Sequence, residues 1–159
     1  DSAFFESAKP LRGLKASVYE GGIRVPYIAR WPGRIKAAGT SNHISAFWDF
    51  LPTCCELIGQ DPPQDIDGIS MMPTLLGQDR KQKKHEYLYW ELRGQQAIRM
   101  GKWKALRLKP GRKIELYDLD SDIAELKDLA DEHPEIVAEM AEIFRTGRTK
   151  SEVFPLPKA

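Results

Sequence analysis

The sequence predicts an α+β fold in which a four-stranded antiparallel sheet is covered by a C-terminal helix, with a further strand and helix nearer the N-terminus. Three observations support this prediction. Four short runs of β-branched, aromatic or alternating residues lie between residues 87 and 117, an amphipathic pattern begins at Pro134, and an apolar run followed by a helical pattern precedes both. Consecutive strands followed by a helix are typical of this class, whereas α/β proteins alternate the two.

The four predicted strands are short and are separated by turn residues. Glycine or proline interrupts the runs at spacings that suit hairpins, which favours an antiparallel sheet. The alternating pattern of residues 103–109 predicts a strand with one face in solvent. The expected strands are residues 87–92, 96–100, 103–108 and 113–117, with turns at Gly94, Gly101-Lys102 and Pro110-Gly111.

The last helix is expected to begin near Pro134, because proline suits the first position of a helix. Apolar residues recur along it at intervals of three and four, with glutamates on the other side. A sheet with one apolar face needs a cover, so we expect this helix to pack on the sheet. The apolar stripe consists of Ile136, Val137, Met140, Ile143 and Phe144.

The N-terminal third is expected to contain one strand. Residues 1–22 have the mixed polarity of a loop. Residues 23–31 form a short apolar run rich in β-formers, and Pro32-Gly33 closes it as a turn would. This run predicts a buried strand.

A helix that ends at Gly59 is expected next, with Trp48, Leu51, Cys55 and Ile58 on one apolar side. Its N-cap is Ser45 or Asp49, and Asp49 is favoured because Pro52 then falls in the first turn. A polar linker over residues 60–67 and a short helical turn within residues 68–77, capped by Ser70, follow.

Composition limits the function. The chain has 159 residues, of which 42% are hydrophobic and 30% charged, as in ordinary globular proteins. Its formal net charge of +1 gives no overall attraction for nucleic acid or for a membrane surface, so neither is expected as a partner. No apolar run approaches the ~20 residues that cross a bilayer.

Most catalytic and metal-binding patterns are absent from the sequence. There is no Gly-x-Ser-x-Gly elbow and no phosphate-binding glycine motif. Cys54 and Cys55 are adjacent and lack the spacing of metal ligands, so we expect free thiols and no metal site. Asp65 and Asp67 are interpreted as linker residues. The histidines, interpreted as surface or capping residues, are His43, His85 and His133.

One loop carries a candidate for chemistry. Residues 11–26 read Leu-Arg-Gly-Leu-Lys-Ala-Ser-Val-Tyr-Glu-Gly-Gly-Ile-Arg-Val-Pro, with Lys15 between flanking glycines. Glycine lets the backbone approach where a Cβ would clash, so such a loop can bring an ammonium group close to an anion. Lysine is a compact point charge with rotatable donors, which suits that role.

The loop resembles the type I sulfatases, the arylsulfatase family of the alkaline-phosphatase superfamily. In these enzymes a lysine just before Tyr-Glu-Gly-Gly-x-Arg-x-Pro contacts the sulfate ester. Similar motifs recur in the same order over residues 11–145, which is typical of the C-terminal part of such an enzyme, and residues 153–157 resemble the tail of bacterial members. These motifs lie at residues 48–53, 67–70, 73–77, 89–91, 97–104, 115–119 and 133–135.

One departure from the family pattern is visible. Residues 122–125 read Asp-Ile-Ala-Glu, where such enzymes often have Asp-Pro-Gly-Glu. We expect this difference to change a turn and not the chemistry.

The resemblance implies an α/β parent for this α+β chain. Residues 1–60 would be the C-terminal edge of the large catalytic domain, and residues 61–159 a small C-terminal subdomain. It also implies hydrolysis of aryl or carbohydrate sulfate esters by the parent, a sulfuric ester hydrolase that uses a calcium ion and a formylglycine residue.

The same resemblance implies the site residues. Lys15 would be the catalytic and substrate-binding cation, since fixed positive charge facing a developing anion is a strong catalytic effect. Glu20 and Arg24 would be structural, with Arg24 paired to a carboxylate. Trp90, Glu91 and Arg93 are candidate substrate contacts.

The remaining catalytic groups are expected before residue 1 of this chain. No Cys/Ser-x-Pro-x-Arg motif and no Asp-Asp or Asp-Asn pair for calcium is present. We therefore expect the chain alone to be inactive and to hold no cofactor, and expect its partner to be the upstream N-terminal domain of the parent. The family also implies a periplasmic or secreted location, and unpaired apolar surface predicts self-association.

Two alternatives remain at this point. The parent could be a related phosphonate or phosphate ester hydrolase of the same superfamily, because the nucleophile that would decide is not in the chain. The chain could also be a non-catalytic module that binds sulfated glycans through Lys15 and other basic residues. Those residues are Arg107, Lys109, Arg112 and Lys113.

Overall fold

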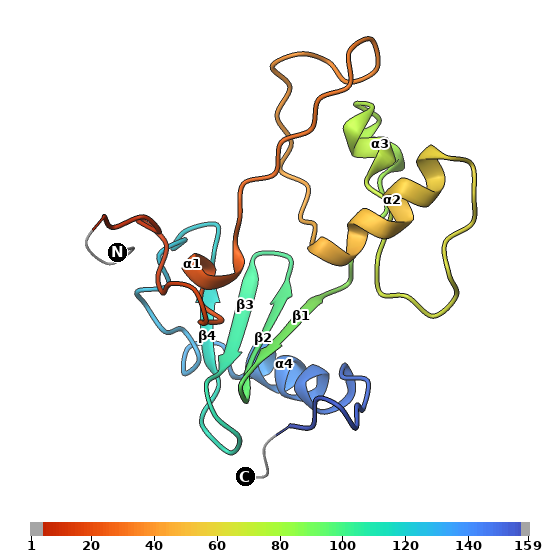
Figure 1. Ribbon diagram of the computed structural model, residues 1–159. Helices are drawn as coiled ribbons and strands as arrows, with labels where there is room; N and C mark the ends of the chain where they lie inside the picture. The colour runs from red at the N-terminus through yellow and green to blue at the C-terminus, as the bar shows by residue number, and fades with distance from the viewer. Residues whose placement is uncertain (1–4, 157–159) are drawn as a thin grey trace. The chain divides into compact units, whose positions relative to one another are not determined.

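The computed structural model describes residues 5–156 and divides the chain into two compact units (Figure 1). Unit 1 combines the segment up to Val25 with the chain from Tyr87 onward, and unit 2 is Pro26–Glu86. The boundary predicted at residue 60 concerns the domains of a longer parent, and it stays a prediction.

Unit 1 is built on the predicted antiparallel sheet. The strands are β1 (Leu88–Leu92), β2 (Gln95–Met100), β3 (Trp103–Arg107) and β4 (Glu115–Asp118), and they neighbour one another in chain order. The register pairs Ala97 with Leu106 and Lys104 with Tyr117, as expected for consecutive hairpins. The α+β class and its four-stranded sheet are therefore confirmed.

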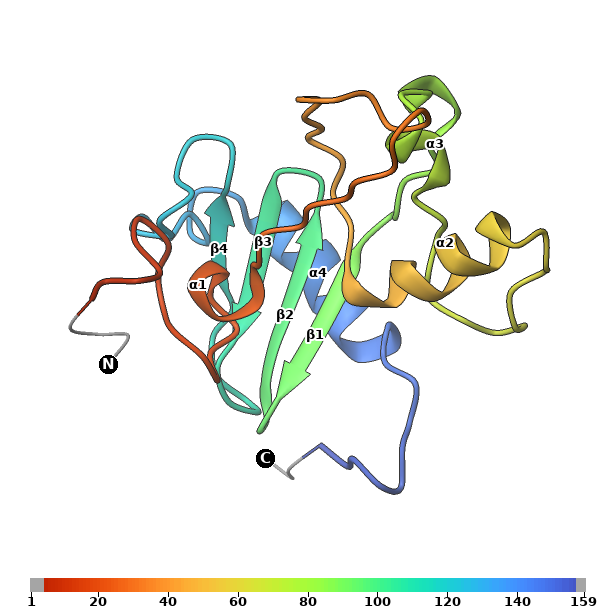
Figure 2. The ribbon, with the colours of Figure 1, turned by 45° about the horizontal axis from the view of Figure 1, so that its top comes forward.

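Helix α4 (Pro134–Thr146) covers one face of this sheet, as predicted. Met140 and Phe144 are buried in one cluster with Ile98 and Ala105 of the central strands. Figure 2 shows the helix lying behind the strands. The three/four spacing of its apolar residues places them on the side that faces the sheet.

The other face of the sheet is also covered, which the sequence did not lead us to expect. Val18 and Tyr19 pack against Ala97 and Leu106 there, and the short helix α1 (Glu20–Ile23) follows directly. In Figures 1 and 2, α1 lies in front of the sheet and α4 behind it. The prediction of a solvent-exposed face on the third strand was wrong, because Lys104 is 0% exposed.

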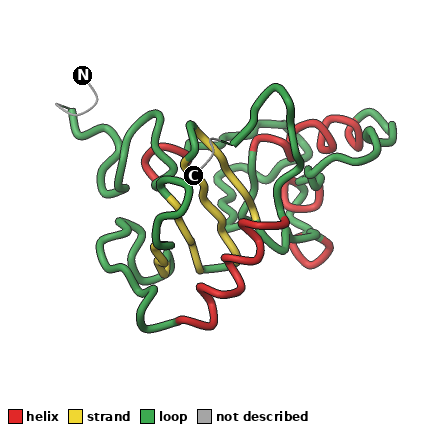
Figure 3. The backbone as a smooth tube through the Cα atoms, turned by 90° about the horizontal axis from the view of Figure 1, so that it is seen from below, coloured by secondary structure: helices red, strands yellow, loops and turns green. Residues whose placement is uncertain are grey.

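The strand predicted over residues 23–31 was also wrong. Ile23 ends helix α1, and residues 24–31 are irregular, with Val25, Tyr27 and Ile28 exposed. A strand needs a neighbour for its N–H and C=O groups. The strands drawn in yellow in Figure 3 all belong to the one sheet of unit 1, and within residues 5–156 no strand pairs with this segment.

Unit 2 contains the predicted helix, divided into a turn of 3₁₀-helix, η1 (Phe47–Asp49), and α2 (Phe50–Leu57). Asp49 directly precedes α2, as favoured from the sequence. Its carboxylate, however, accepts hydrogen bonds from the N–H groups of Ala46 and Ile69, each at 2.8 Å, and not from the helix it precedes. Asp49 therefore fastens the loop around residue 69 to the start of the helix.

The predicted short helical turn is α3 (Met72–Leu75), and the 3₁₀-helix η2 (Asp79–Lys81) follows it. The N-cap of α3 is Met71 and not the predicted Ser70, although the Ser70 hydroxyl accepts a hydrogen bond from the N–H of Met72 at 3.2 Å. Within residues 5–156, no helix is both long and apolar enough to cross a membrane.

Candidate functional site: the Lys15 loop

The candidate site is the segment 12–23, here called the Lys15 loop. Lys15 and Ala16 form its tip, where the N–H of Ser17 donates to the Leu14 carbonyl at 3.1 Å. Ala16 has φ of +71°, a left-handed conformation that is unfavourable for a residue with a Cβ. The tip is thus a tight turn with some backbone strain at the residue after the lysine.

The two consecutive glycines explain why this segment can fold so tightly. A Cβ on Gly21 would lie 2.4 Å from the Gly13 carbonyl oxygen, and one on Gly22 would lie 2.1 Å from the Ser17 carbonyl oxygen. Both distances are far below van der Waals contact, and backbone atoms cannot move aside cheaply. The Gly-Gly pair is therefore required by close backbone packing.

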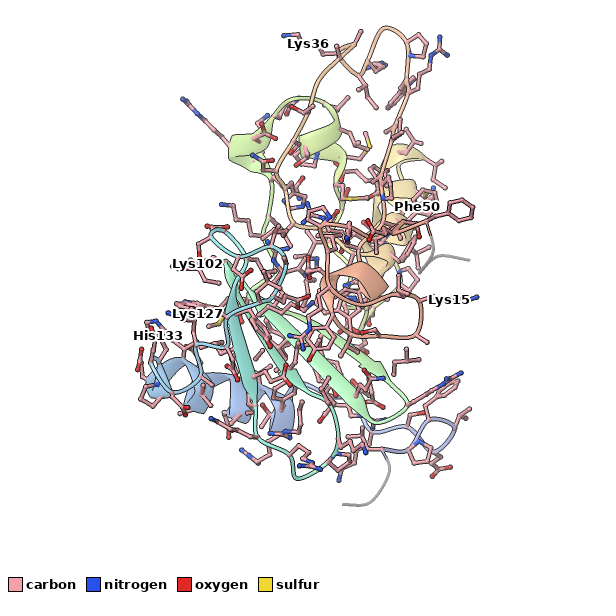
Figure 4. The ribbon with its side chains drawn as sticks, turned by 90° about the vertical axis from the view of Figure 1, so that its left-hand side faces the viewer. Lys15, Lys36, Phe50, Lys102, Lys127 and His133 are labelled. Atoms are coloured by element: carbon pink, nitrogen blue, oxygen red, sulfur yellow. The ribbon has the colours of Figure 1, made fainter. Side chains whose placement is uncertain are left out.

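Lys15 itself is exposed. Figure 4 shows its side chain extending from the loop, away from the sheet. Nowhere among residues 5–156 does its ammonium group find a hydrogen-bond acceptor or an ion-pair partner. The group is thus available to an anion.

The base of the loop is held by a buried ion cluster, defined as Glu20, Lys104 and Glu125. Lys104 Nζ lies 2.8 Å from Glu20 Oε1 and 2.8 Å from Glu125 Oε1. The side chains of Lys104 and Glu125 are 0% exposed and that of Glu20 is 3% exposed. Charges this deeply buried are tolerated only when they are paired.

Glu125 holds the loop by its backbone as well as its side chain. Its Oε2 accepts the Glu20 N–H at 2.7 Å, and its carbonyl oxygen accepts a hydrogen bond from Arg12 Nη1 at 2.8 Å. Burial raises the pKa of Glu125, while the adjacent Lys104 ammonium acts in the opposite direction. One residue thus contacts both ends of the Lys15 loop.

Two tyrosines fasten the loop to the sheet beside this cluster. The hydroxyls of Tyr19 and Tyr117 both donate to Glu115 Oε2, at 2.7 and 2.8 Å. Burial and these hydrogen bonds raise the pKa of both tyrosines. The Arg12 guanidinium lies 4.0 Å from the centre of the Tyr19 ring, a cation–π arrangement, and donates to the Tyr117 hydroxyl at 3.0 Å.

Two arginines lie at longer distance from Glu20. Arg24 and Arg99 approach its Oε2 to 3.7 and 3.9 Å. The expectation that Arg24 pairs with a carboxylate of the fold agrees with this contact. Burial lowers the pKa of Arg99, and the charge of Glu20 partly offsets this.

The other candidate substrate contacts are not brought together. Trp90 packs on the sheet face that the Lys15 loop covers. Arg93 is exposed in the β1–β2 turn, near which Gln95 Nε2 donates to the Ala16 carbonyl at 3.5 Å. Glu91 instead pairs with Arg148, whose Nε lies 2.6 Å from Glu91 Oε2.

Lys104 and Glu125 were not identified from the sequence. The sequence predicted one solvent-exposed face for the strand that contains Lys104, so a buried lysine was not expected. The expectation that the departure at residues 122–125 changes only a turn stays a prediction. The fourth residue of that segment keeps the glutamate of the family pattern, and its carboxylate is the one that pairs with Lys104. The retention of this glutamate, where the residues before it differ from the family pattern, was the sequence signal that could have identified Glu125.

Residues of unit 2 supply no catalytic arrangement. His85 Nε2 lies 2.8 Å from Asp49 Oδ1, so this histidine supports the loop structure. Cys54 and Cys55 are free thiols. Within the described residues, no three His, Cys, Asp or Glu side chains could together hold a metal ion. This chain's own residues therefore do not fit the calcium site that the family implies.

Known proteins resemble this chain in sequence. Residues 14–150 match the family described as "N-sulphoglucosamine sulphohydrolase, C-terminal". An N-acetylgalactosamine-6-O-sulfatase of Bacteroides thetaiotaomicron is 32% identical over 156 residues, which cover 87% of this chain and 30% of that relative. Human arylsulfatase A is 39% identical over 100 residues, covering 60% of this chain and 20% of that protein.

Solved structures share the fold. One is a Bacteroides thetaiotaomicron structure whose description concerns the metabolism of multiple glycosaminoglycans. It superposes with a TM-score of 0.76 at 29% identity, and the match covers 94% of this chain and 35% of the chain of that structure. The chain thus spans between a fifth and about a third of the length of these relatives. Because this family model covers residues 14–150, the chain belongs to the sulfatase family, of which it is a C-terminal part.

Proposed function

We propose that this chain supplies the sulfate-binding cation of a sulfatase, a sulfuric ester hydrolase, and that Lys15 is that cation. One observation carries the proposal. Lys15 is an exposed ammonium group, unpaired among the described residues, at the tip of a loop whose base is anchored by buried charges. Surface lysines are usually mobile, whereas this one projects from a firmly held backbone.

The chemistry assigned to Lys15 is electrostatic. Hydrolysis of a sulfate ester develops negative charge on the sulfate and on the leaving oxygen. A preorganised cation facing these oxygens lowers the energy of the transition state more than that of the ground state. The ammonium group can also donate hydrogen bonds to them, since it has three rotatable donors.

The rest of the site is assigned to the upstream domain of a longer parent. A formylglycine residue would provide the nucleophile, and a calcium ion would bind sulfate oxygens. The sequence has no Cys/Ser-x-Pro-x-Arg motif from which a formylglycine could be made, and no cluster of three His, Cys, Asp or Glu side chains between residues 5 and 156 could hold the calcium ion. The chain alone is therefore proposed to be inactive.

The proposed substrate class is a sulfated carbohydrate rather than an aryl sulfate. In its support, the relative named above is an N-acetylgalactosamine-6-O-sulfatase. A further solved relative is Ps i-CgsB in complex with k-i-k-neocarrahexaose. It has a TM-score of 0.74 at 27% identity, and the match covers 87% of this chain and 32% of the chain of that structure. A periplasmic or secreted parent is proposed with this substrate, because polymeric sulfated glycans lie outside the cytoplasm.

The two alternatives have less support. The relatives reported above are sulfatases, which disfavours a phosphonate or phosphate ester hydrolase. A glycan-binding module would need free basic residues, but Lys113 pairs with Asp131 at 2.8 Å and Arg107 stacks 4.7 Å from the Phe144 ring.

Expression of the longer natural reading frame that contains this chain tests the proposal. Purified parent should release sulfate from N-acetylgalactosamine 6-sulfate or a sulfated oligosaccharide, and residues 1–159 alone should release none. A parent that cleaves phosphonate or phosphate esters in preference would contradict it. Turnover by the isolated chain would contradict the assignment of the nucleophile to the upstream domain.

A further inference from the structure

We propose that Lys104 and Glu125 are positioning residues of the sulfate site, which act on Lys15 by fixing the loop that carries it. The inference rests on the proposed function and adds to it two residues that do not touch the substrate. Lys104 lies on strand β3, and Glu125 lies in the segment between β4 and α4. Together they clamp Glu20, five residues after Lys15.

Burial of the ion cluster is the first argument. Three charged side chains are almost completely removed from water, at a desolvation cost that pairing offsets only when the geometry is good. A plain structural contact at this position could be made by apolar residues, as happens beside it at Val18 and Leu106. Charged residues instead give an oriented connection, because Lys104 Nζ lies 2.8 Å from one oxygen of each carboxylate.

The second argument is the pattern of contacts. Glu125 accepts hydrogen bonds from Arg12, which precedes the loop tip, and from the N–H of Glu20, which follows the tip. Lys104 holds the Glu20 carboxylate from the sheet side at 2.8 Å. Lys15 lies between the two fixed ends. A loop fixed at both ends leaves its central residue few positions to adopt.

The third argument is the strained tip. Ala16 has a positive φ, and such a conformation persists only where the surrounding structure enforces it. The Lys15 ammonium group makes no hydrogen bond or ion pair among residues 5–156 that could enforce it, and the Gln95 amide reaches the Ala16 carbonyl only at 3.5 Å. The closer and buried anchors lie at the base of the loop, where Lys104 and Glu125 hold Glu20.

Hydrogen exchange on this chain tests the anchorage without any sulfate chemistry. The informative amides are those of Glu20, Gly21 and Gly22, which donate to Glu125, Arg12 and Tyr19 at 2.7 to 2.9 Å. Lys104→Met should speed their exchange at least tenfold while amides of β2 and β3 stay protected. Lys102→Met is the matched control, since Lys102 lies in the β2–β3 turn, is 46% exposed and pairs with Asp118 at 2.6 Å. It should leave exchange in the loop unchanged.

Two further variants guard against simple unfolding. Glu125→Gln keeps the shape and an oxygen for the Glu20 N–H, so it should open the loop by less than Lys104→Met does. The triple variant Glu20→Gln, Lys104→Met, Glu125→Gln removes all three charges of the cluster together and leaves no fully buried charge unpaired, since Arg99 beside it is 18% exposed. Equal acceleration across loop and sheet in every variant, or no acceleration in any, would overturn the anchorage.

A kinetic cycle in the longer parent tests the action through Lys15. Lys104→Met should lower kcat about tenfold or more when Lys15 is present, since small misplacements of catalytic groups are costly. In a Lys15→Ala background the same change should lower kcat less than twofold. An equal loss in both backgrounds would contradict positioning and indicate only a smaller folded fraction. If Lys15→Ala alone leaves kcat unchanged, the proposed function fails. The hydrogen-exchange experiment still tests separately whether Lys104 and Glu125 anchor the loop.

Discussion

Lys104 Nζ lies 2.8 Å from Glu20 Oε1, although 84 residues separate the two in the sequence. This contact joins the Lys15 loop to the middle of the sheet, in a place with no access to water. The loop motif and the sheet are therefore one structure, and the Glu of Tyr-Glu-Gly-Gly has a structural function that can be named.

Loss of the buried cation should destabilise unit 1 strongly. Lys104→Met leaves the Glu20 and Glu125 carboxylates buried without their partner, which typically costs about 3–5 kcal/mol. The triple variant that neutralises all three residues should cost less, because no fully buried charge remains unpaired; Arg24 and Arg99, which approach Glu20, both reach solvent. Urea unfolding followed by tryptophan fluorescence measures both. A triple variant less stable than the single one would contradict this account of the cluster.

The Gly-Gly pair should not tolerate even a methyl group. Gly21→Ala places a Cβ 2.4 Å from a backbone oxygen, so the loop must shift, at a cost of about 1–3 kcal/mol. Gly39→Ala is the control, since its Cβ would meet one carbonyl oxygen at 3.3 Å. Unfolding midpoints of the two variants can be compared directly, and a Gly21→Ala protein as stable as the wild type would show that the loop is not this tightly packed.

Stability should fall at alkaline pH because of the two tyrosines on Glu115. Their pKa is raised in the folded state, so above the ordinary value of 10.0 the unfolded chain loses tyrosyl protons that the folded chain retains. The free energy of unfolding then decreases with pH by about 1.4 kcal/mol per pH unit for each tyrosine. Tyr19→Phe should reduce this slope.

The measurement is urea unfolding at several pH values between neutral and strongly alkaline. Tyrosinate absorbance provides an independent check, because Tyr19 and Tyr117 should ionise only as the protein unfolds. A slope equal in wild type and Tyr19→Phe would contradict the assignment.

The isolated chain should self-associate through helix α2. Phe50 and Ile58 are 58% and 69% exposed, with Phe47 nearby at 80%, and patches of this kind favour association. Phe50→Lys combined with Ile58→Lys should give a monomer. Leu126→Lys, at an exposed leucine of unit 1, is the control and should not. Light scattering after size exclusion gives the mass, and a wild-type monomer at all concentrations would contradict the prediction.

The sheet and helix α4 could be predicted because their signals are local. Strand alternation, turn glycines at hairpin spacing and the stripe after Pro134 each specify an element without reference to distant residues. Helix α2 was predicted for the same reason, from Asp49, Pro52 and Gly59.

The errors have a different physical origin. Residues 24–31 have the composition of a strand, but a strand forms only beside a partner, and none is available within the described chain. Lys104 was assigned to solvent because alternation reports which residues share a face and not what covers that face. Its cover is a segment 84 residues away, which no local pattern reveals.

Lys15 was found through its glycine-rich surroundings and a family resemblance, and its exposure in the structure is compatible with that assignment. The most direct measurement is kcat for sulfate release by the longer parent with Lys15→Ala, beside Lys36→Ala as an exposed-lysine control. The account predicts a loss of about 10²–10³-fold in kcat for Lys15→Ala and none for the control. Equal kcat in wild type and Lys15→Ala would contradict it.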